Sequence, residues 1–186
     1  MPRIIAGDNK GMILNAPKGD RTRPTTDKVK EAIFSIIQVR VPNASFLDLF
    51  AGSGQMGLEA LSRGASKAVF VEKNRQSIYV IQENIAKAGR IQESEIVAGD
   101  VASALRRIAD RNESFDIIFM DPPYKEAKKM LDIVADQVCK NSLLSEDGVL
   151  IIEHDSDDIF DETVINLTLS RRCKYGSTML TFYQIL

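Results

Sequence analysis

The chain has 186 residues, the length of one ordinary domain or of one domain with a small appendage. It is 44% hydrophobic and 27% charged, and no apolar stretch approaches the roughly 20 residues that a membrane-spanning helix needs. One histidine and two widely separated cysteines leave little room for a His-rich or thiolate metal site, or for a serine or cysteine triad. We therefore expect a cytoplasmic globular protein that needs neither a membrane nor a metal.

The first part of the chain is basic and the rest is acidic. Residues 1–40 contain eight Lys or Arg and four Asp or Glu, a net charge of +4, whereas the whole chain carries −2. A basic segment on an acidic body suggests a docking surface for a polyanion, and a solvated charged face explains the counts equally well.

Residues 1–42 predict a small N-terminal appendage. Period-two patterns at 3–6 and 12–15 predict a hairpin, and a loop rich in Pro, Gly and Arg follows. Thr26 is placed to cap a helix whose apolar residues recur at helical spacing and which ends before Pro42.

From residue 43 onward, short apolar runs alternate with amphipathic segments, which is typical of a parallel sheet with helical crossovers on both faces. Strands are expected at 46–50, 68–72, 95–98, 115–120 and 149–153. Helices are expected at 55–63, 75–87, 101–109 and 127–140. Two last strands, at 164–170 and 178–184, should form a hairpin that closes an α/β sheet of seven strands.

A glycine-rich loop follows the first strand of the predicted sheet. Residues 48–57 contain Gly-x-Gly-x-x-Gly, which lets the backbone turn sharply and lets a ligand approach the start of a helix. Glu72 ends the second strand, 18 residues beyond Gly54, where an acidic side chain reaches the ribose of an adenosine cofactor. Asp100 follows the third strand and would meet the adenine amino group. Together these strand ends predict a nucleoside pocket.

Two cofactors fit such a pocket, a nicotinamide dinucleotide and S-adenosylmethionine. Asp48 favours S-adenosylmethionine, because a carboxylate before the glycine loop can meet the ammonium of a methionine tail but would repel a pyrophosphate. The residues expected to bind the cofactor are Asp48, Phe50, Ala51, Gly52, Ser53, Gly54, Gly57, Glu72, Lys73, Asp100 and Val101.

The tetrapeptide Asp121-Pro122-Pro123-Tyr124 comes directly after the apolar run 115–120. A run of β-formers that stops at a double proline predicts a buried strand that ends in a rigid loop. One carboxylate, two proline-flanked carbonyls and an aromatic face suit a planar group that bears an NH2. We expect these four residues to form the catalytic site.

These motifs resemble class I S-adenosylmethionine-dependent methyltransferases that carry an Asp/Asn-Pro-Pro-aromatic motif. The closer resemblance, through residues 3–7, 10–11, 22–25, 48–65 and 121–124, is to the RsmD family. It implies a Rossmann-like fold and methylation of the exocyclic N2 of one guanine in small-subunit (16S) ribosomal RNA, either naked or in a ribosomal assembly particle. The candidates for phosphate contacts are Arg3, Lys10, Arg21, Arg23 and Lys28.

Other acceptors and another class of function stay open. Adenine N6 in nucleic acid and a protein glutamine also present a planar NH2. A nicotinamide-dependent dehydrogenase is disfavoured by Asp48 and by the lack of a catalytic constellation for that chemistry. A non-catalytic RNA-binding module would bind no cofactor.

Overall fold

The computed structural model describes residues 1–17 and 26–186, with the side chain of Tyr124 left out. Arg21 and Arg23 therefore lie outside the described residues. The elements, in chain order, are α1 (Asp27–Ile36), β1 (Ser45–Asp48), α2 (Gln55–Ser62), β2 (Lys67–Glu72), α3 (Arg75–Ala88), β3 (Ser94–Ala98), α4 (Val101–Ala109), β4 (Phe115–Met120), the 3-10 helix η1 (Tyr124–Glu126), α5 (Ala127–Lys140), β5 (Leu144–Asp155), β6 (Thr163–Val164), β7 (Leu167–Tyr175) and β8 (Thr178–Ile185).

The strands form one sheet in the order β3-β2-β1-β4-β5-β8-β7-β6. The five strands β1 to β5 run parallel, and β8, β7 and β6 add antiparallel to the β5 edge. This confirms the predicted α/β architecture and the C-terminal hairpin. The described strands number eight rather than seven, because the segment predicted as one strand at 164–170 turns after Val164. Ile165 has a φ of 58° there, and β6 is the short piece before the turn.

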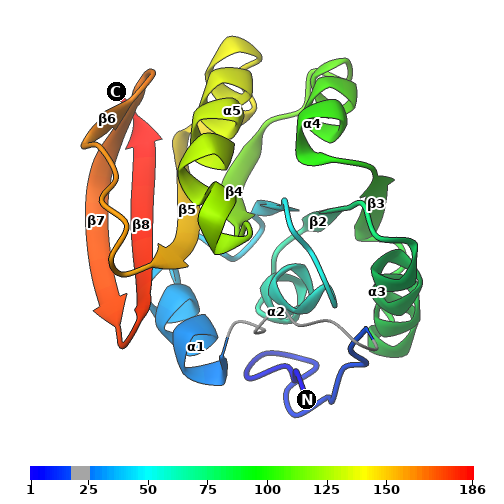
Figure 1. The fold of residues 1–186 in the computed structure, drawn as a ribbon. Coiled ribbons are helices and arrows are strands. Elements are labelled where there is room, and N and C mark those ends of the chain that lie inside the picture. Colours follow the sequence, from blue (N-terminus) through cyan, green and yellow to red (C-terminus); the bar gives the residue numbers. More distant parts are fainter. Residues whose placement is uncertain (18–25) are drawn as a thin grey trace.

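Helices cover both faces of the sheet, which explains why the central strands are apolar on both sides. On one face α1, α2 and α3 pack against side chains such as Phe46, Phe119 and Ile151. On the other face α4 and α5 pack against Leu47, Ile118 and neighbouring residues. Figure 1 shows these two helical layers on either side of the strands. None of the helices in the described parts of the chain is long and apolar enough to cross a bilayer.

The N-terminal hairpin was predicted incorrectly in one respect. Residues 3–6 and 12–15 run antiparallel, but they share a single bridge, between Arg3 and Ile13, and form no regular strands. The reason is that much of this backbone bonds to helix side chains instead. The N–H groups of Ile5 and Ala6 donate to Glu59 of α2, at 2.7 and 3.0 Å.

The predicted helix cap is confirmed. Thr26 adopts an extended backbone, and its Oγ1 accepts a hydrogen bond from the N–H of Val29, 3.3 Å away. Ile4 and Leu14 of the N-terminal segment are buried in the same core as α1 and the sheet. The segment is therefore packed onto the face that carries α2 and α3.

Candidate functional site

Three carboxylates lie side by side near the carboxyl ends of three adjacent strands, β1, β4 and β5. Asp48 ends β1 and pairs with Phe119 of β4, which pairs in turn with Ile151 of β5. Since side chains alternate along a strand, the residues two positions further on, Asp121 and Glu153, lie on the same face as Asp48. That face carries α2, whose first turn and preceding glycine loop adjoin Asp48.

The glycine loop turns through left-handed backbone conformations that favour glycine. Gly52 has a φ of 54° and Gly54 a φ of 78°. The N–H of Gly52 donates to Glu72 Oε2, 2.9 Å away, and the carbonyl of Ser53 accepts from Asn84 Nδ2 at 2.8 Å. The end of β2 and a side chain of α3 therefore hold the loop in place.

Gly57 serves packing between α2 and the sheet. A Cβ at this position would lie 2.3 Å from Cε1 of the Phe70 ring, closer than any real contact. Gly57→Ala should therefore lower the free energy of unfolding by about 1 to 3 kcal/mol, measured by urea denaturation. Adding Phe70→Leu should recover part of that loss, because the smaller side chain makes room. Equal stability of Gly57→Ala and the wild type would contradict this packing role.

Asp48 is a buried carboxyl group of the site. It is 1% exposed, its Oδ2 accepts from the N–H of Gly57 at 3.3 Å, and its Oδ1 has no hydrogen-bond partner. Burial raises the pKa of Asp48 to about 7, and the neighbouring Glu72 adds to the rise. A buried oxygen without a donor is costly, so this position suits a ligand that brings a cationic N–H donor.

Glu72 and Asp100 stand at the ends of the next two strands. Glu72 accepts hydrogen bonds from the N–H groups of Gly52, Lys73 and Asn74. A carboxylate has about four acceptor positions, so one is left for a ligand. Asp100 caps α4, and its bonds from the backbone and hydroxyl of Ser103 lower its pKa. Both carboxylates lie at the carboxyl edge of the sheet.

The remaining predicted cofactor residues flank this edge. Ala51 and Val101 are buried, Phe50 is partly buried against the core, and Lys73 is exposed. The structure therefore gathers the predicted set along the ends of β1, β2 and β3.

The Asp121 loop leaves β4 beside the same edge. Asp121 is partly buried, Pro122 is buried, and the carbonyl of Pro123 accepts from the N–H of Glu126 at 2.8 Å. Burial, followed by the carboxylates of Glu153 and Asp48, raises the pKa of Asp121 well above its usual range. The backbone of Tyr124 begins η1, and its side chain lies outside the described structure.

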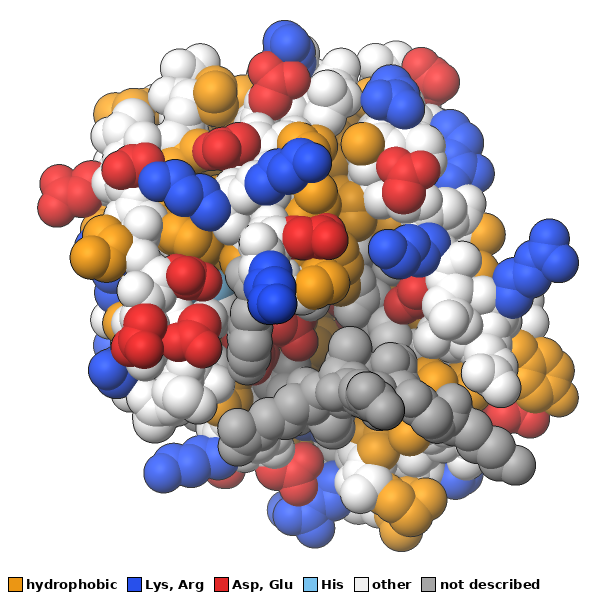
Figure 2. All heavy atoms as spheres, viewed as in Figure 1, with side chains coloured by type: hydrophobic (Ala, Val, Ile, Leu, Met, Phe, Trp, Pro, Cys, Tyr) orange, Lys and Arg blue, Asp and Glu red, His pale blue; other side chains and the backbone are white. Residues whose placement is uncertain are grey.

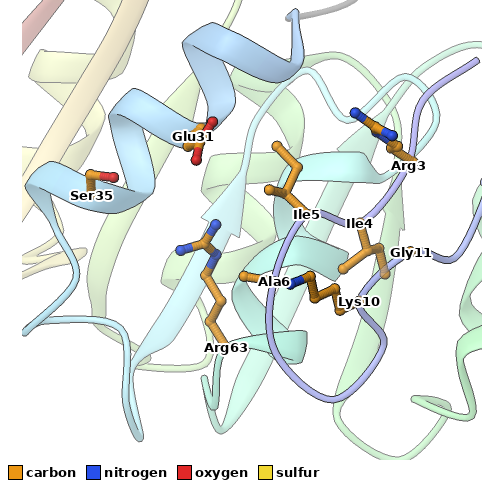
Figure 3. A pocket seen from close by; sticks show the side chains of 9 residues that line it. All are labelled: Arg3, Ile4, Ile5, Ala6, Lys10, Gly11, Glu31, Ser35 and Arg63. Carbon is orange, nitrogen blue, oxygen red and sulfur yellow. The ribbon is translucent and has the colours of Figure 1, made fainter.

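The basic residues predicted to contact RNA are brought together only in part. Arg3 and Lys10 line one cavity of about 470 Å³. Arg63 also lines this cavity, and its side chain extends from the end of α2 toward α1 (Figure 3). Arg3 is 60% exposed and pairs with Asp27, at 2.7 Å. Lys28 is exposed on α1 and does not line this cavity.

Sequence reasoning missed two buried polar residues that position the site. Asn84 of α3 bonds both the glycine loop and the backbone of Asn15. Glu59 of α2 is fully buried and binds Arg63 at 2.7 Å and Lys30 at 3.5 Å. Polar residues on apolar helix faces are the signal that could have found both. No three His, Cys, Asp or Glu side chains among the described residues could together hold a metal ion.

Comparisons with a family model and with curated proteins point to the same family. The family model described as "Conserved hypothetical protein 95" matches residues 2–184. The chain is 40% identical to "Putative rRNA methyltransferase YlbH" of Bacillus subtilis, over 98% of both chains. It is 32% identical to "Ribosomal RNA small subunit methyltransferase D" of Escherichia coli, over 98% of this chain and 89% of the relative.

A solved structure agrees. "Putative methyltransferase yhhF from Escherichia coli" has a TM-score of 0.85 and 31% identity, covering 98% of this chain and 97% of that one. The match of the family model over almost the whole length, with these relatives, establishes the family. This chain belongs to the RsmD family of class I methyltransferases.

Proposed function

We propose that this protein transfers a methyl group from S-adenosylmethionine to the exocyclic N2 of a guanine in small-subunit ribosomal RNA. The observation that carries the proposal is the position of the Asp121 loop, beside Asp48 and the glycine loop at one edge of the sheet. The names of the curated relatives, which refer to ribosomal RNA, support the substrate class.

The residues at the strand ends suit each part of the cofactor. The unpartnered Oδ1 of Asp48 accepts a hydrogen bond from the ammonium group of the methionine tail, and the backbone of the glycine loop approaches the ligand closely. Glu72 binds the ribose hydroxyls, and Asp100 meets the adenine amino group. When bound, S-adenosylmethionine supplies a methyl group on a positively charged sulfur, which is open to attack by nitrogen.

Asp121 and Pro122 activate the target nitrogen. The lone pair of an exocyclic guanine amine is delocalised into the ring, so the amine is a poor nucleophile. Acceptance of its N–H hydrogens by the Asp121 carboxylate and the Pro122 carbonyl localises that lone pair and stabilises the charge that develops on nitrogen. The base has to leave its stack to enter the site, as other base-modifying enzymes require, and Tyr124 stacks on it there. Pro123 stiffens the loop.

Residues 1–42 form the RNA-docking part of the protein in this proposal, and residues 43–186 form the methyltransferase domain. On the part of the surface that Figure 2 shows and the structure describes, Lys and Arg are interspersed with Asp and Glu. In this proposal docking depends on particular basic side chains, namely Arg3, Lys10, Lys28 and the two arginines at 21 and 23.

Arg3→Glu with Lys10→Glu should weaken RNA binding and leave cofactor affinity unchanged. If each side chain contacts a phosphate, the slope of log K against log salt should fall by about 0.7 to 0.9 for each lost contact. The matched control, Arg106→Glu with Lys140→Glu, changes the net charge equally on the helices of the other face. An equal loss of RNA affinity in both double variants would show that the loss comes from the change in net charge, and would contradict specific contacts by Arg3 and Lys10.

The proposed function is tested by transfer of labelled methyl from S-adenosylmethionine, followed by nucleoside analysis of the product. The acceptors are naked small-subunit ribosomal RNA and assembly particles from cells that lack this protein. Label in N2-methylguanosine is the expected result. Label in N6-methyladenosine or in protein would assign another planar NH2 as the acceptor. No label on any RNA, despite measurable cofactor binding, would contradict the proposal.

A further inference from the structure

Glu153 lies next to Asp121 on the neighbouring strand β5, two residues before that strand ends at Asp155. The pairing of Phe119 with Ile151 and of Met120 with Ile152 places Asp121 opposite Glu153 at the next position. On its other side Glu153 pairs with Leu180 of β8, a core residue, and Glu153 itself is 5% exposed. An acidic side chain is rarely buried to this degree unless it is paired with another group.

Among the described residues, the charged groups that act on Asp121 from neighbouring strands are both carboxylates. Glu153 faces it from β5 and Asp48 from β1, while Glu72 of β2 acts on Asp48 in turn. Burial first, and then these two neighbouring carboxylates, raises the pKa of Asp121. The negative charge of Glu153 therefore makes Asp121 hold a proton more readily than it would without this neighbour.

The neighbours of Glu153 along β5 are apolar. The preceding residues, Ile151 and Ile152, are fully buried. Two carboxyl groups side by side at the edge of the sheet where the other candidate site residues gather are typical of a site that carries out chemistry.

The chain's single histidine does not face this pair. His154 is the next residue along β5, so it points to the opposite face of the sheet. There its ring nitrogens lie 2.8 Å from the carbonyl of Asp155 and 2.8 Å from the hydroxyl of Thr181, and the ring stacks on Phe160. An imidazole is therefore not the proton acceptor of the site.

We propose that Asp121 accepts the proton that the target nitrogen releases on methylation, and that Glu153, beside it on β5, acts through Asp121 by favouring its protonated form. This rests on the proposed function. The new C–N bond forms as the bond between the donor sulfur and the methyl carbon breaks; the electron pair of that bond stays on sulfur, which becomes neutral, and nitrogen is left with a positive charge. One N–H bond then breaks, its electron pair stays on nitrogen, and the proton joins a carboxylate oxygen of Asp121. The charge of the pair changes from −2 to −1 until the proton passes to water.

The direct test is Glu153→Gln, which keeps the size of the side chain and removes its charge. The titration of the Asp121 carboxyl carbon, followed by carbon-13 NMR, should move to lower pH in this variant. The same shift should appear in the acidic limb of the single-turnover methylation rate, because methylation needs Asp121 ionised. Glu153→Asp keeps the charge and should keep both midpoints close to those of the wild type. Glu146→Gln, an exposed position at the other end of β5, is the matched control.

The outcomes separate this inference from the proposed function. Shifts in both the titration and the rate limb support the inference. An unmoved titration, or a moved titration with an unmoved rate limb, overturns it while wild-type methylation still stands. A wild type that methylates no RNA overturns the proposed function and with it the proton-accepting role. If Glu153→Gln fails to fold, Glu153→Asp provides the test. Because this variant keeps the negative charge, a large change in the midpoint of the Asp121 titration or of the acidic limb of the methylation rate would overturn the inference.

Discussion

The Asp121→Ala variant is expected to bind S-adenosylmethionine as the wild type does and to transfer its methyl group roughly 30- to 1000-fold more slowly. This corresponds to a loss of about 2 to 4 kcal/mol, typical of removing one preorganised group that stabilises charge in the transition state. The physical reason is that Asp121 meets the target amine at the end of β4, whereas the proposed cofactor contacts lie at the ends of β1, β2 and β3. Single-turnover rates and calorimetric binding of the cofactor measure the two quantities separately.

Two further variants sharpen this result. Asp121→Asn keeps one acceptor oxygen but not the charge, so its rate should lie between those of Asp121→Ala and the wild type. Asp110→Ala removes an exposed carboxylate at the end of α4 and should leave the rate unchanged. Full activity in Asp121→Ala would remove this carboxylate from the mechanism.

The Asp48→Asn variant is expected to be more stable than the wild type at pH 8 and to bind S-adenosylmethionine more weakly. In the folded protein burial raises the pKa of Asp48 to about 7, from the ordinary aspartate value of 3.8. Below pH 3.8 both the folded and the unfolded states hold the proton. As pH rises toward 7, only the unfolded state has released it, so the wild type loses stability that an asparagine does not lose. The full difference is on the order of 4 kcal/mol.

The pH dependence of stability tests whether the buried charge of Asp48 causes the higher stability of Asp48→Asn. The stability difference between Asp48→Asn and the wild type, from urea unfolding, should grow from pH 4 to pH 8, and Asp110→Asn should show no such gain because that side chain is exposed. Wild-type cofactor affinity should rise with pH through about 7, as Asp48 ionises and can meet an ammonium. A stability difference that does not change with pH would refute the buried charge as its source.

That the candidate site residues gather at one edge of the sheet could be predicted from the sequence, because the signals for it are local. The glycine spacing marks the loop after β1, and the double proline marks the end of β4. Since the carboxyl ends of parallel strands meet at one edge of a sheet, the order of elements alone placed Asp48, Glu72 and Asp121 together.

The structural features that the sequence did not predict depend mostly on contacts between segments that are distant in the chain. The N-terminal backbone bonds to Glu59 in place of forming regular strands, and Glu59 lies more than 50 residues further along the chain. Glu153 ends an apolar run, but its place opposite Asp121 follows from the register of β4 and β5, which the residue pattern does not fix. The turn at Ile165 likewise gives no glycine signal, since a β-branched residue adopts a positive φ there.

The central claim is that Asp121 helps to methylate a guanine of small-subunit ribosomal RNA. The most direct test is the nucleoside composition of that RNA from cells that lack this protein and from the same cells given either the wild type or Asp121→Ala. N2-methylguanosine should fall when the protein is absent, return with the wild type and stay low with Asp121→Ala. Unchanged N2-methylguanosine in the absence of the protein, or its full return with Asp121→Ala, would contradict the claim.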